Sequence, residues 1–432
     1  MKRNRFIFHG WLIVATGIVA YALGYGARYS FSVIFPSLVS EYGWPRDTTA
    51  GMLSVHMLVY GLVAPVSGYL VDKIGPRMTM VSGTAFLALG LAISARGNEL
   101  WHLYLTFGVL SGAGLCLLGS VPFTTVIKNW FERKTGLALS LLFFGVGGGF
   151  AWYPAVAALI NRVSWRGTFL IEAMIVPAVL VPLIILIVRY HPRDMGLSPD
   201  DASESSIVPL AGGHGTPEVS NQAGAAVDWT LGKAARTLRF WLLCLSTFCV
   251  WGIAQTLMVA HHVVFAMDMG YSSTYASSVL SLFGVMFACG CLAGMVSDSI
   301  GREPTMTIGT LIGISGIFVL TFITGPSRPW TLYYYAITLG FGQGMTVPTI
   351  AASIMDIFRG PRVGAIIGSV WFSFSVGGAI GPWLGGWIFE ANGSYLVAFI
   401  VAMVLSAAGC LAIWGAAPRK RQGVGRKRVI GP

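Results

Sequence analysis

The sequence predicts an all-α membrane protein with twelve transmembrane helices in two six-helix bundles related by a pseudo-twofold axis. Three observations carry this prediction: a large excess of apolar residues, their grouping into long runs, and a repeat that relates the two halves of the chain. Of the 432 residues, 55% are hydrophobic and only 10% are charged. A soluble chain carries roughly 25% charged residues, so this chain has too few to cover a water-facing surface. Soluble enzyme classes are therefore excluded.

Long apolar runs define the expected spans, because a helix needs about 20 apolar residues to cross a bilayer. The first half contains such runs at 11–40, 49–71, 78–96, 101–127, 136–160 and 168–190. The second half contains them at 240–267, 274–297, 304–324, 330–355, 363–389 and 395–416. The runs predict an N-terminal bundle over 1–190, a polar cytoplasmic linker over 191–238, a C-terminal bundle over 239–416 and a basic cytoplasmic tail over 417–432. Within the linker, 229–239 is expected to form a short amphipathic helix on the membrane surface.

The distribution of Lys and Arg predicts the orientation of the spans. One alternate set of loops is rich in basic residues and includes Lys2, Arg3 and Arg5 at the start of the chain. The opposite loops hold only Arg46, Arg96, Arg162, Arg166 and Arg328. Because cytoplasmic loops carry the excess of Lys and Arg, we expect both termini in the cytoplasm and the spans in the cytoplasmic (inner) membrane. The net charge of +11 then reflects topology and does not indicate a nucleic-acid partner.

An internal repeat relates the two sets of spans. The pattern Gly68-x-x-x-Asp72-x-x-Gly75 recurs as Gly294-x-x-x-Asp298-x-x-Gly301. At nearly the same separation, Gly114 corresponds to Gly340, Pro122 to Pro348 and Pro154 to Pro382. Parallel repeats of six spans, related by an axis along the membrane normal, are typical of one large class of transporters.

Three segments show a family resemblance. The segment Gly68-Tyr-Leu-Val-Asp72-Lys-Ile-Gly75-Pro-Arg77 resembles the signature of the major facilitator superfamily between spans 2 and 3. The segments Tyr25-Gly-Ala-Arg28-Tyr-Ser-Phe and His261-His262-Val-Val-Phe-Ala-Met-Asp268 resemble the monocarboxylate-porter branch that includes oxalate/formate antiporters. The resemblance implies the major facilitator fold and a carrier of small organic anions that works by alternating access. Relatives in this branch often hold the carboxylate with a cation in span 8 or 11, but 274–297 and 363–389 contain neither Lys nor Arg.

Arg28 is the candidate substrate anchor. A cation inside the hydrocarbon costs at least about 2.5–3.5 kcal/mol, and the planar guanidinium can hold a carboxylate with two hydrogen bonds. The alternative is an internal bond to carbonyls or an extended side chain that reaches the outer face. The repeat places Gln255 at the corresponding position of span 7. Further candidates for substrate contact are Tyr25, Trp152, Trp371 and His262.

Proton coupling is expected to involve histidine. Carriers relay protons through Asp, Glu or His, and no carboxylate lies in the middle of an expected span, since Glu172, Asp268 and Asp356 lie near span ends. The candidates are His56, His261 and His262. Neighbouring residues of a helix face about 100° apart, so at most one of the adjacent pair faces the cavity, and the resemblance slightly favours His262. The alternative for each is a neutral imidazole bonded to a helix carbonyl.

Asp72 and Asp298 are the candidate gating residues, together with Arg77 and Arg302. Each aspartate opens an inner loop, where it can bind the basic or dipolar end of a neighbouring helix in one conformation only. Simple helix capping is the alternative. Expected inner-face partners are Glu132, Arg133, Lys134, Arg359 and Arg362.

The sequence contains no phosphate-binding loop and no zinc-protease motif, so we expect no catalytic residues, cofactor or metal. The expected function is a secondary active transporter, a symporter or antiporter, that moves a small organic anion such as a monocarboxylate, with protons as a candidate coupling ion. The protein is expected to work as a monomer in the bilayer. Two alternatives stay open: the same fold exporting a drug or other solute, and a membrane receptor or sensor that does not transport.

Overall fold

The computed structural model describes residues 8–131, 134–199, 229–323, 325–358 and 363–417, and every regular element within these ranges is helical. Most of the predicted linker, nearly all of the basic tail, and the expected gating partners Glu132, Arg133, Arg359 and Arg362 lie outside the described residues.

The N-terminal half begins with a long first pass that bends at Ser30. Its elements are α1 (His9–Tyr29), α2 (Phe31–Tyr42), α3 (Arg46–Ile74), α4 (Pro76–Ser94), α5 (Leu100–Leu103), η1 (Tyr104–Ser111), α6 (Gly112–Leu118), α7 (Ser120–Trp130), α8 (Thr135–Phe150) and α9 (Tyr153–Ile187), followed by the short η2 (Pro192–Met195). Most boundaries lie near the ends of the apolar runs, but α9 continues through Arg162 and Arg166 between two expected runs.

The C-terminal half repeats this arrangement. Its elements are α10 (Leu231–Ala235), α11 (Leu238–Ser246), η4 (Thr247–Gln255), α12 (Thr256–Asp268), α13 (Ser273–Ala293), η5 (Gly294–Val296), α14 (Ser297–Ile300), α15 (Arg302–Leu320), α16 (Trp330–Ile357), α17 (Val363–Asn392) and α18 (Leu396–Ala416). The short α10 lies inside the segment expected to form an amphipathic surface helix.

Ten helical segments of the described chain are long and apolar enough to cross a membrane. One of them, Leu137–Ile187, has 51 residues and turns at Ser164, whose φ of 65° is not helical. It therefore contains two of the expected spans, 136–160 and 168–190. The expected span at 330–355 is helical as α16 but is not among the ten. A multi-helix membrane protein is thus established, while the count of twelve stays a prediction.

The repeat seen in the sequence has a backbone counterpart. Gly75 and Gly301, the last glycines of the two motifs, have positive φ values of 82° and 106°. Each ends one helix and immediately precedes the next. A left-handed conformation favours glycine because it has no Cβ, which explains why both copies of the motif end on this residue.

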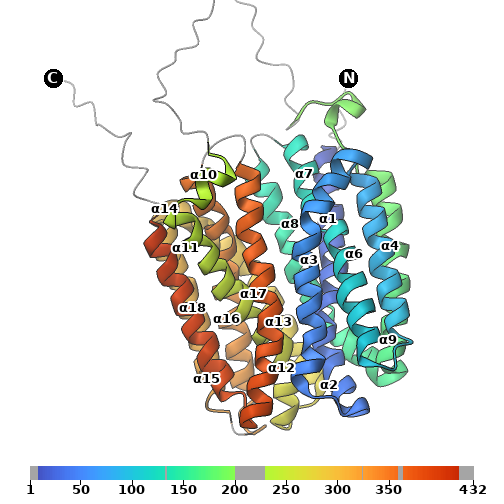
Figure 1. Cartoon of the computed structure of the whole chain (residues 1–432), viewed down its shortest axis with the longest axis vertical. Coiled ribbons are helices and arrows are strands. Elements are labelled where there is room, and N and C mark those ends of the chain that lie inside the picture. Colours follow the sequence, from blue (N-terminus) through green and yellow to red (C-terminus); the bar gives the residue numbers. More distant parts are fainter. Residues whose placement is uncertain (1–7, 132–133, 200–228, 324, 359–362, 418–432) are drawn as a thin grey trace, which may run out of the picture.

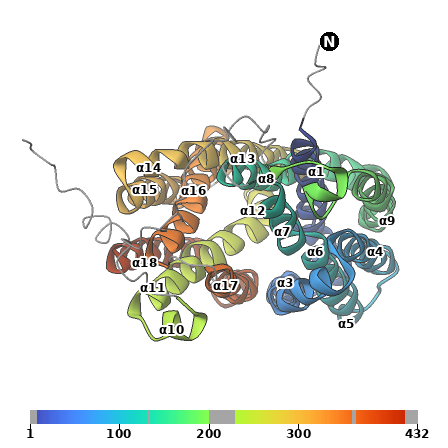
Figure 2. The same ribbon diagram turned by 90° about the horizontal axis from the view of Figure 1, so that it is seen from above.

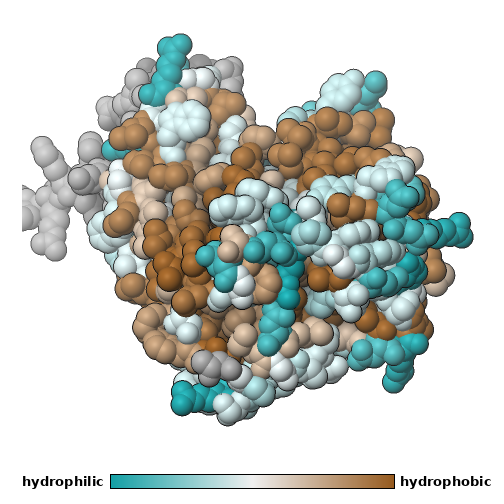
Figure 3. Space-filling view, turned by 60° about the horizontal axis from the view of Figure 1, so that its bottom comes forward, coloured by the Kyte–Doolittle hydropathy of each residue, from teal (hydrophilic) through white to brown (hydrophobic). Residues whose placement is uncertain are grey.

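The two halves stand side by side with their helices roughly parallel (Figures 1 and 2). We call the end where α1 begins and α18 ends the terminal end, and the opposite end, which contains Gly43 and Gly270, the distal end. In Figure 3 the distal end is turned toward the viewer, and hydrophobic side chains flank a central zone of hydrophilic ones. This distribution is expected for a bundle whose sides face lipid and whose loops face water.

Helices α3 and α17 form the first seam between the halves. Near the distal end, the Trp383 backbone N–H donates to Ser54 Oγ at 3.2 Å. At mid-depth, a Cβ added to Gly61 would lie 2.4 Å from the Cβ of Ser375, so the two helices touch closely there. About two turns further toward the terminal end, Tyr69 is 60% exposed and a Cβ on Gly368 would meet nothing within 4 Å.

Helices α8 and α13 form the second seam, which ends at a similar depth. A Cβ on Gly147 would lie 2.7 Å from the Gly284 carbonyl and 3.0 Å from the Ala288 Cβ. Toward the terminal end of α8, Leu137 is 46% exposed. The halves are therefore in contact near the distal end of the bundle and separate from each other toward the terminal end.

Candidate substrate-binding site

Arg28 occupies the last turn of α1, and its side chain is completely buried. Its guanidinium carbon lies 4.4 Å from the ring centre of Tyr60 and 5.1 Å from that of Tyr25. Among the described residues, none of its three nitrogens has a hydrogen-bond acceptor. The cation is held by two aromatic faces, and its hydrogen-bonding capacity is unused.

The two tyrosines are themselves fixed by a chain of hydrogen bonds. The hydroxyls of Tyr25 and Tyr60 lie 3.0 Å apart, and Tyr60 Oη lies 3.0 Å from Ser120 Oγ on α7. The two phenols therefore bond to each other and to Ser120, and neither forms a hydrogen bond with the guanidinium. Cation–π contact is worth about 0.5–2 kcal/mol, whereas each buried polar group left unpaired costs about 1–3 kcal/mol. An anionic hydrogen-bond acceptor next to the Arg28 guanidinium would therefore be strongly stabilised.

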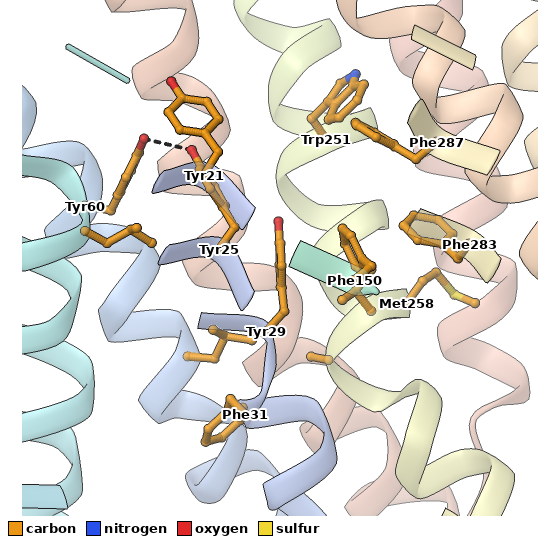
Figure 4. Packing of buried hydrophobic residues seen from close by; sticks show 14 of the residues in the cluster. Tyr21, Tyr25, Tyr29, Phe31, Tyr60, Phe150, Trp251, Met258, Phe283 and Phe287 are labelled. Carbon is orange, nitrogen blue, oxygen red and sulfur yellow. Dashed lines mark hydrogen bonds between the residues drawn. The ribbon is translucent and has the colours of Figure 1, made fainter. Parts of the chain in front are cut away.

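An aromatic series joins the two halves on the terminal side of Arg28. The ring centres of Tyr21 and Phe143 lie 6.1 Å apart, those of Phe143 and Trp371 6.5 Å, and those of Trp371 and Trp251 6.5 Å. Figure 4 shows Tyr21 and Tyr25 on α1 across from Trp251 and Phe287 of the other half. The Tyr21 hydroxyl and Trp251 Nε1 have no partner among the described residues, so both halves present unused hydrogen-bonding groups here.

A second aromatic group closes the distal side of this region. The Tyr29 ring stacks on Phe150 at 4.6 Å, and Phe150 meets Phe283 of the other half at 5.0 Å. Ser281 donates from Oγ to the Phe150 carbonyl at 2.8 Å. In Figure 4 these residues lie below Tyr25 and Trp251, toward the distal end. A solute next to Tyr21 and Trp251 is therefore separated from the distal surface.

The other residues predicted to contact the substrate lie at different places in the bundle. Trp371 lies between Phe143 and Trp251, as described. Trp152 is half-buried at the break between α8 and α9 and packs beside Gly26 of α1. Gln255 is 5% exposed and lies one helical turn beyond Trp251. The substrate contacts of all three stay predictions.

Each of the three candidate histidines is bonded to a backbone carbonyl. His56 Nδ1 lies 3.0 Å from the Phe107 oxygen, His261 Nε2 lies 2.7 Å from the Pro382 oxygen, and His262 Nε2 lies 3.2 Å from the Ala276 oxygen. His262 also stacks on Tyr335 inside the C-terminal half, while His261 meets Phe35 of the N-terminal half. This geometry matches the structural alternative of a neutral imidazole, and proton coupling through histidine stays a prediction.

Comparison with known proteins gives the family. The family model of the Major Facilitator Superfamily matches residues 17–370 and 288–430. The chain belongs to the Major Facilitator Superfamily. The resemblance of its loop motif is thereby confirmed at the level of the superfamily.

Curated relatives of this major facilitator include transporters named for monocarboxylates. Monocarboxylate transporter 13 of Rattus norvegicus is 26% identical over 409 residues, covering 93% of this chain and 87% of the relative. Monocarboxylate transporter 11 of Homo sapiens is 25% identical over 417 residues, covering 93% and 81%. An uncharacterized MFS-type transporter, YcxA of Bacillus subtilis (strain 168), is 24% identical and covers 91% and 92%. The resemblance to the monocarboxylate branch agrees with these matches.

A solved structure confirms the fold. A bacterial homologue of the human lysosomal transporter Spinster, in an inward-facing and occupied conformation, matches with a TM-score of 0.69 at 15% identity. The match covers 96% of this chain and 98% of the other. At this identity the likeness concerns the fold alone, and it supports the major facilitator architecture.

Among the residues that the structure describes, the motif aspartates of this major facilitator form no ion pair between the halves. Asp72 is exposed, and Arg77 of the same motif donates from Nε and Nη2 to the Val188 carbonyl at 3.1 and 2.8 Å. Arg302 lies 2.6 Å from Asp298 and 2.9 Å from Asp356. Each partner lies in the same half as the residue that it contacts, so a gating role for the four motif residues stays a prediction.

An ion pair that the sequence does not predict joins the halves at the distal end. Arg46, the first residue of α3, donates to both carboxylate oxygens of Asp268, the last residue of α12, at 2.5 and 2.9 Å. Arg46 also donates to Tyr395 Oη at 3.1 Å, and Tyr395 Oη lies 3.0 Å from His261 Nδ1. Burial next to this pair raises the pKa of Tyr395. The signal in the sequence was Arg46 in a loop otherwise poor in cations.

Glu172 is a second residue whose surroundings the sequence does not show. It lies eight residues past the turn at Ser164, is only 2% exposed within α9, and accepts a hydrogen bond from Ser30 Oγ at 3.1 Å. The apolar run around it could not show this burial, because burial depends on which helices pack against α9. Glu172 is thus a buried carboxyl group in the body of the bundle.

Proposed function

We propose that this protein is a secondary active transporter that moves a small organic anion, a monocarboxylate, across the cytoplasmic membrane by alternating access. The single observation that carries the proposal is the buried guanidinium of Arg28, which has no acceptor among the described residues. The names of the curated relatives support the same substrate class.

The substrate carboxylate binds Arg28 in this proposal. A guanidinium can donate two parallel hydrogen bonds to a carboxylate, which are shorter and stronger than neutral ones. Tyr25 would stay at the edge of the site through its bond to Tyr60. The apolar part of the solute would contact Trp371 and Trp152, with Gln255 as a further polar contact. We give His262 no part in the site, because its ring packs inside the C-terminal half.

The transport cycle requires the distal contacts to open. On charge grounds the terminal end faces the cytoplasm, so closure at the distal end corresponds to an inward-facing state. The pair of Arg46 and Asp268 would break when the outward-facing state forms. Asp72 and Asp298, which form no ion pair across the halves among the described residues, would then meet basic residues of the opposite half.

Solute counterflow tests this proposal. Liposomes that contain the purified protein are loaded with unlabelled pyruvate. Uptake of labelled pyruvate is then followed with L-lactate, acetate or a lipophilic cation as competitor. We expect counterflow that carboxylates inhibit, and that falls at least about tenfold in Arg28→Gln, because a charged hydrogen bond is worth about 1.5–3 kcal/mol. The exposed Arg96 supplies the matched control, and Arg96→Gln should transport like the wild type.

Each alternative predicts a different result. Counterflow of the lipophilic cation, with no response to carboxylates, indicates a drug exporter. Saturable carboxylate binding without counterflow indicates a receptor or sensor. Unchanged pyruvate counterflow in Arg28→Gln removes Arg28 from the site.

A further inference from the structure

Glu172 is a buried carboxyl group that no cation of the described chain pairs with. It lies eight residues past the distal turn at Ser164, about 12 Å along the helix at 1.5 Å per residue. Within the described residues it forms no ion pair, and its Oε2 atom accepts a hydrogen bond from Ser30. Its Oε1 atom has no hydrogen-bond partner in the same part of the chain. An ionised carboxylate in such surroundings costs several kcal/mol.

The geometry of Ser30 favours the acid form of Glu172. Ser30 Oγ lies 2.9 Å from the Ala27 carbonyl and 3.1 Å from Glu172 Oε2, but a hydroxyl has only one hydrogen. If Glu172 is ionised, its carboxylate must compete with the Ala27 carbonyl for that hydrogen. If Glu172 is protonated, its own O–H donates to Ser30 Oγ, and Ser30 donates to Ala27. The protonated arrangement uses both hydrogens and leaves no buried charge.

The elements packed against α9 are α1, α2, α4 and α13, and their titratable side chains do not neutralise Glu172. These side chains are His9, Tyr21, Tyr25, Arg28 and Tyr29 on α1, Glu41 and Tyr42 on α2, Arg77 on α4, and Tyr275, Cys289 and Cys291 on α13. For the described part of the chain, no ion pair or hydrogen bond joins any of them to Glu172. At the same end of α9, Arg166 is paired with Glu41 at 2.6 Å.

We propose that Glu172 is a proton-binding site of the carrier, linked through Ser30 to the part of α1 that bears Arg28. Ser30 lies at the junction of α1 and α2, and Ala27, which accepts its hydrogen, precedes Arg28. When the proton leaves, the Ser30 hydrogen turns from Ala27 to the carboxylate, and the end of α1 loses a bond. The proton is taken from the water on one side and returned to the water on the other.

The linkage to the substrate follows from charge. This step rests on the proposed function, because it needs an anion at Arg28. An anion bound there adds negative charge to the same low-dielectric bundle and favours the neutral acid at Glu172. Coupling between two ligands is reciprocal, so a proton on Glu172 favours anion binding to the same degree.

Infrared difference spectroscopy tests the proton site without any substrate. The full-length protein in lipid is compared with Glu172→Gln, and with Glu99→Gln as a matched control at an exposed distal loop. At neutral pH we expect the wild type and Glu99→Gln to show the C=O band of a protonated carboxylic acid, and Glu172→Gln to lack it. Identical spectra for all three proteins would overturn the proposal. If Glu172→Gln does not fold, the wild type is titrated instead, and we expect its C=O band to disappear as the pH rises and the buried acid loses its proton.

A pH-gradient experiment tests the coupling. The readout is the ratio of pyruvate uptake with the external medium acidified to uptake at equal pH. We expect this ratio to be severalfold in the wild type and Glu99→Gln, and about one in Glu172→Gln. A severalfold ratio in Glu172→Gln would contradict the coupling while leaving the anion carrier intact. Absence of pyruvate transport in the wild type would instead refute the proposed function, and the infrared result would still decide whether Glu172 holds a proton.

Discussion

Arg46 and Asp268 lie far apart in the chain and form a doubly hydrogen-bonded ion pair at the distal end. Their side chains are 14% and 28% exposed. The guanidinium also lies 3.9 Å from the ring centre of Phe389, and the Arg46 backbone N–H donates to Glu390 Oε1 at 2.8 Å. One residue of α3 thus contacts both α12 and α17 of the other half.

Breaking this pair should shift the protein toward a distal-open state. A partly exposed pair of this kind is worth about 1 kcal/mol, so Arg46→Ala or Asp268→Asn should raise the distal-open population roughly fivefold. Spin labels on the distal ends of α3 and α17 measure the change as a longer distance. The exchanged pair Arg46→Asp with Asp268→Arg should restore the short distance. The pair of Glu41 and Arg166 supplies the control, because both residues lie in the N-terminal half.

The contact between α8 and α13 should be sensitive to side-chain size. Gly147→Leu should open the distal seam, because even a Cβ would approach the Gly284 carbonyl and Ala288 too closely. We expect the reactivity of a single distal cysteine toward a water-soluble maleimide to rise severalfold. Gly368→Ala is the matched control, because it adds a methyl group to open space. Equal reactivity of both variants would show that this seam does not hold the distal end closed.

The Tyr60 ring should matter more than its hydroxyl. Tyr60→Phe removes the bonds to Tyr25 and Ser120 but keeps the aromatic face at 4.4 Å from Arg28. Tyr60→Leu removes both. We expect the pyruvate KM to rise at most about threefold in Tyr60→Phe and about tenfold in Tyr60→Leu. A cation–π contact is worth about 0.5 kcal/mol when it is exposed and about 2 kcal/mol when it is desolvated. Equal effects would assign the role to the hydroxyl chain.

The motif aspartates should affect the balance of states and not the stability of the distal-closed one. Asp72 is exposed and has no ion pair among the described residues. Asp72→Asn should therefore leave the midpoint of thermal unfolding unchanged in the distal-closed state, while lowering the transport rate severalfold. Arg302→Ala should lower that midpoint, because Arg302 bonds to Ser297, Asp298 and Asp356. An unfolding midpoint that falls in Asp72→Asn as well would favour simple capping.

The membrane fold could be predicted from the sequence because hydropathy and the repeated motif act locally. The same reasoning identified Arg28, since a cation within an apolar run is visible without coordinates. The pairing of Arg46 with Asp268 could not be predicted, because it depends on how two distant helix ends meet. The burial of Glu172 could not be predicted for a related reason: it depends on which helices pack against α9. The partner of each histidine is a backbone carbonyl of another segment, which the sequence does not reveal.

Direct binding of a carboxylate to Arg28 tests the central claim. Isothermal titration of the purified wild type with pyruvate is compared with Arg28→Gln, Arg28→Lys and the control Arg96→Gln. We predict saturable binding that weakens roughly tenfold to a hundredfold in Arg28→Gln, from the 1.5–3 kcal/mol of a charged hydrogen bond. Arg28→Lys should fall between, since it keeps the charge without the planar fork. Equal affinity of wild type and Arg28→Gln for pyruvate would contradict the account.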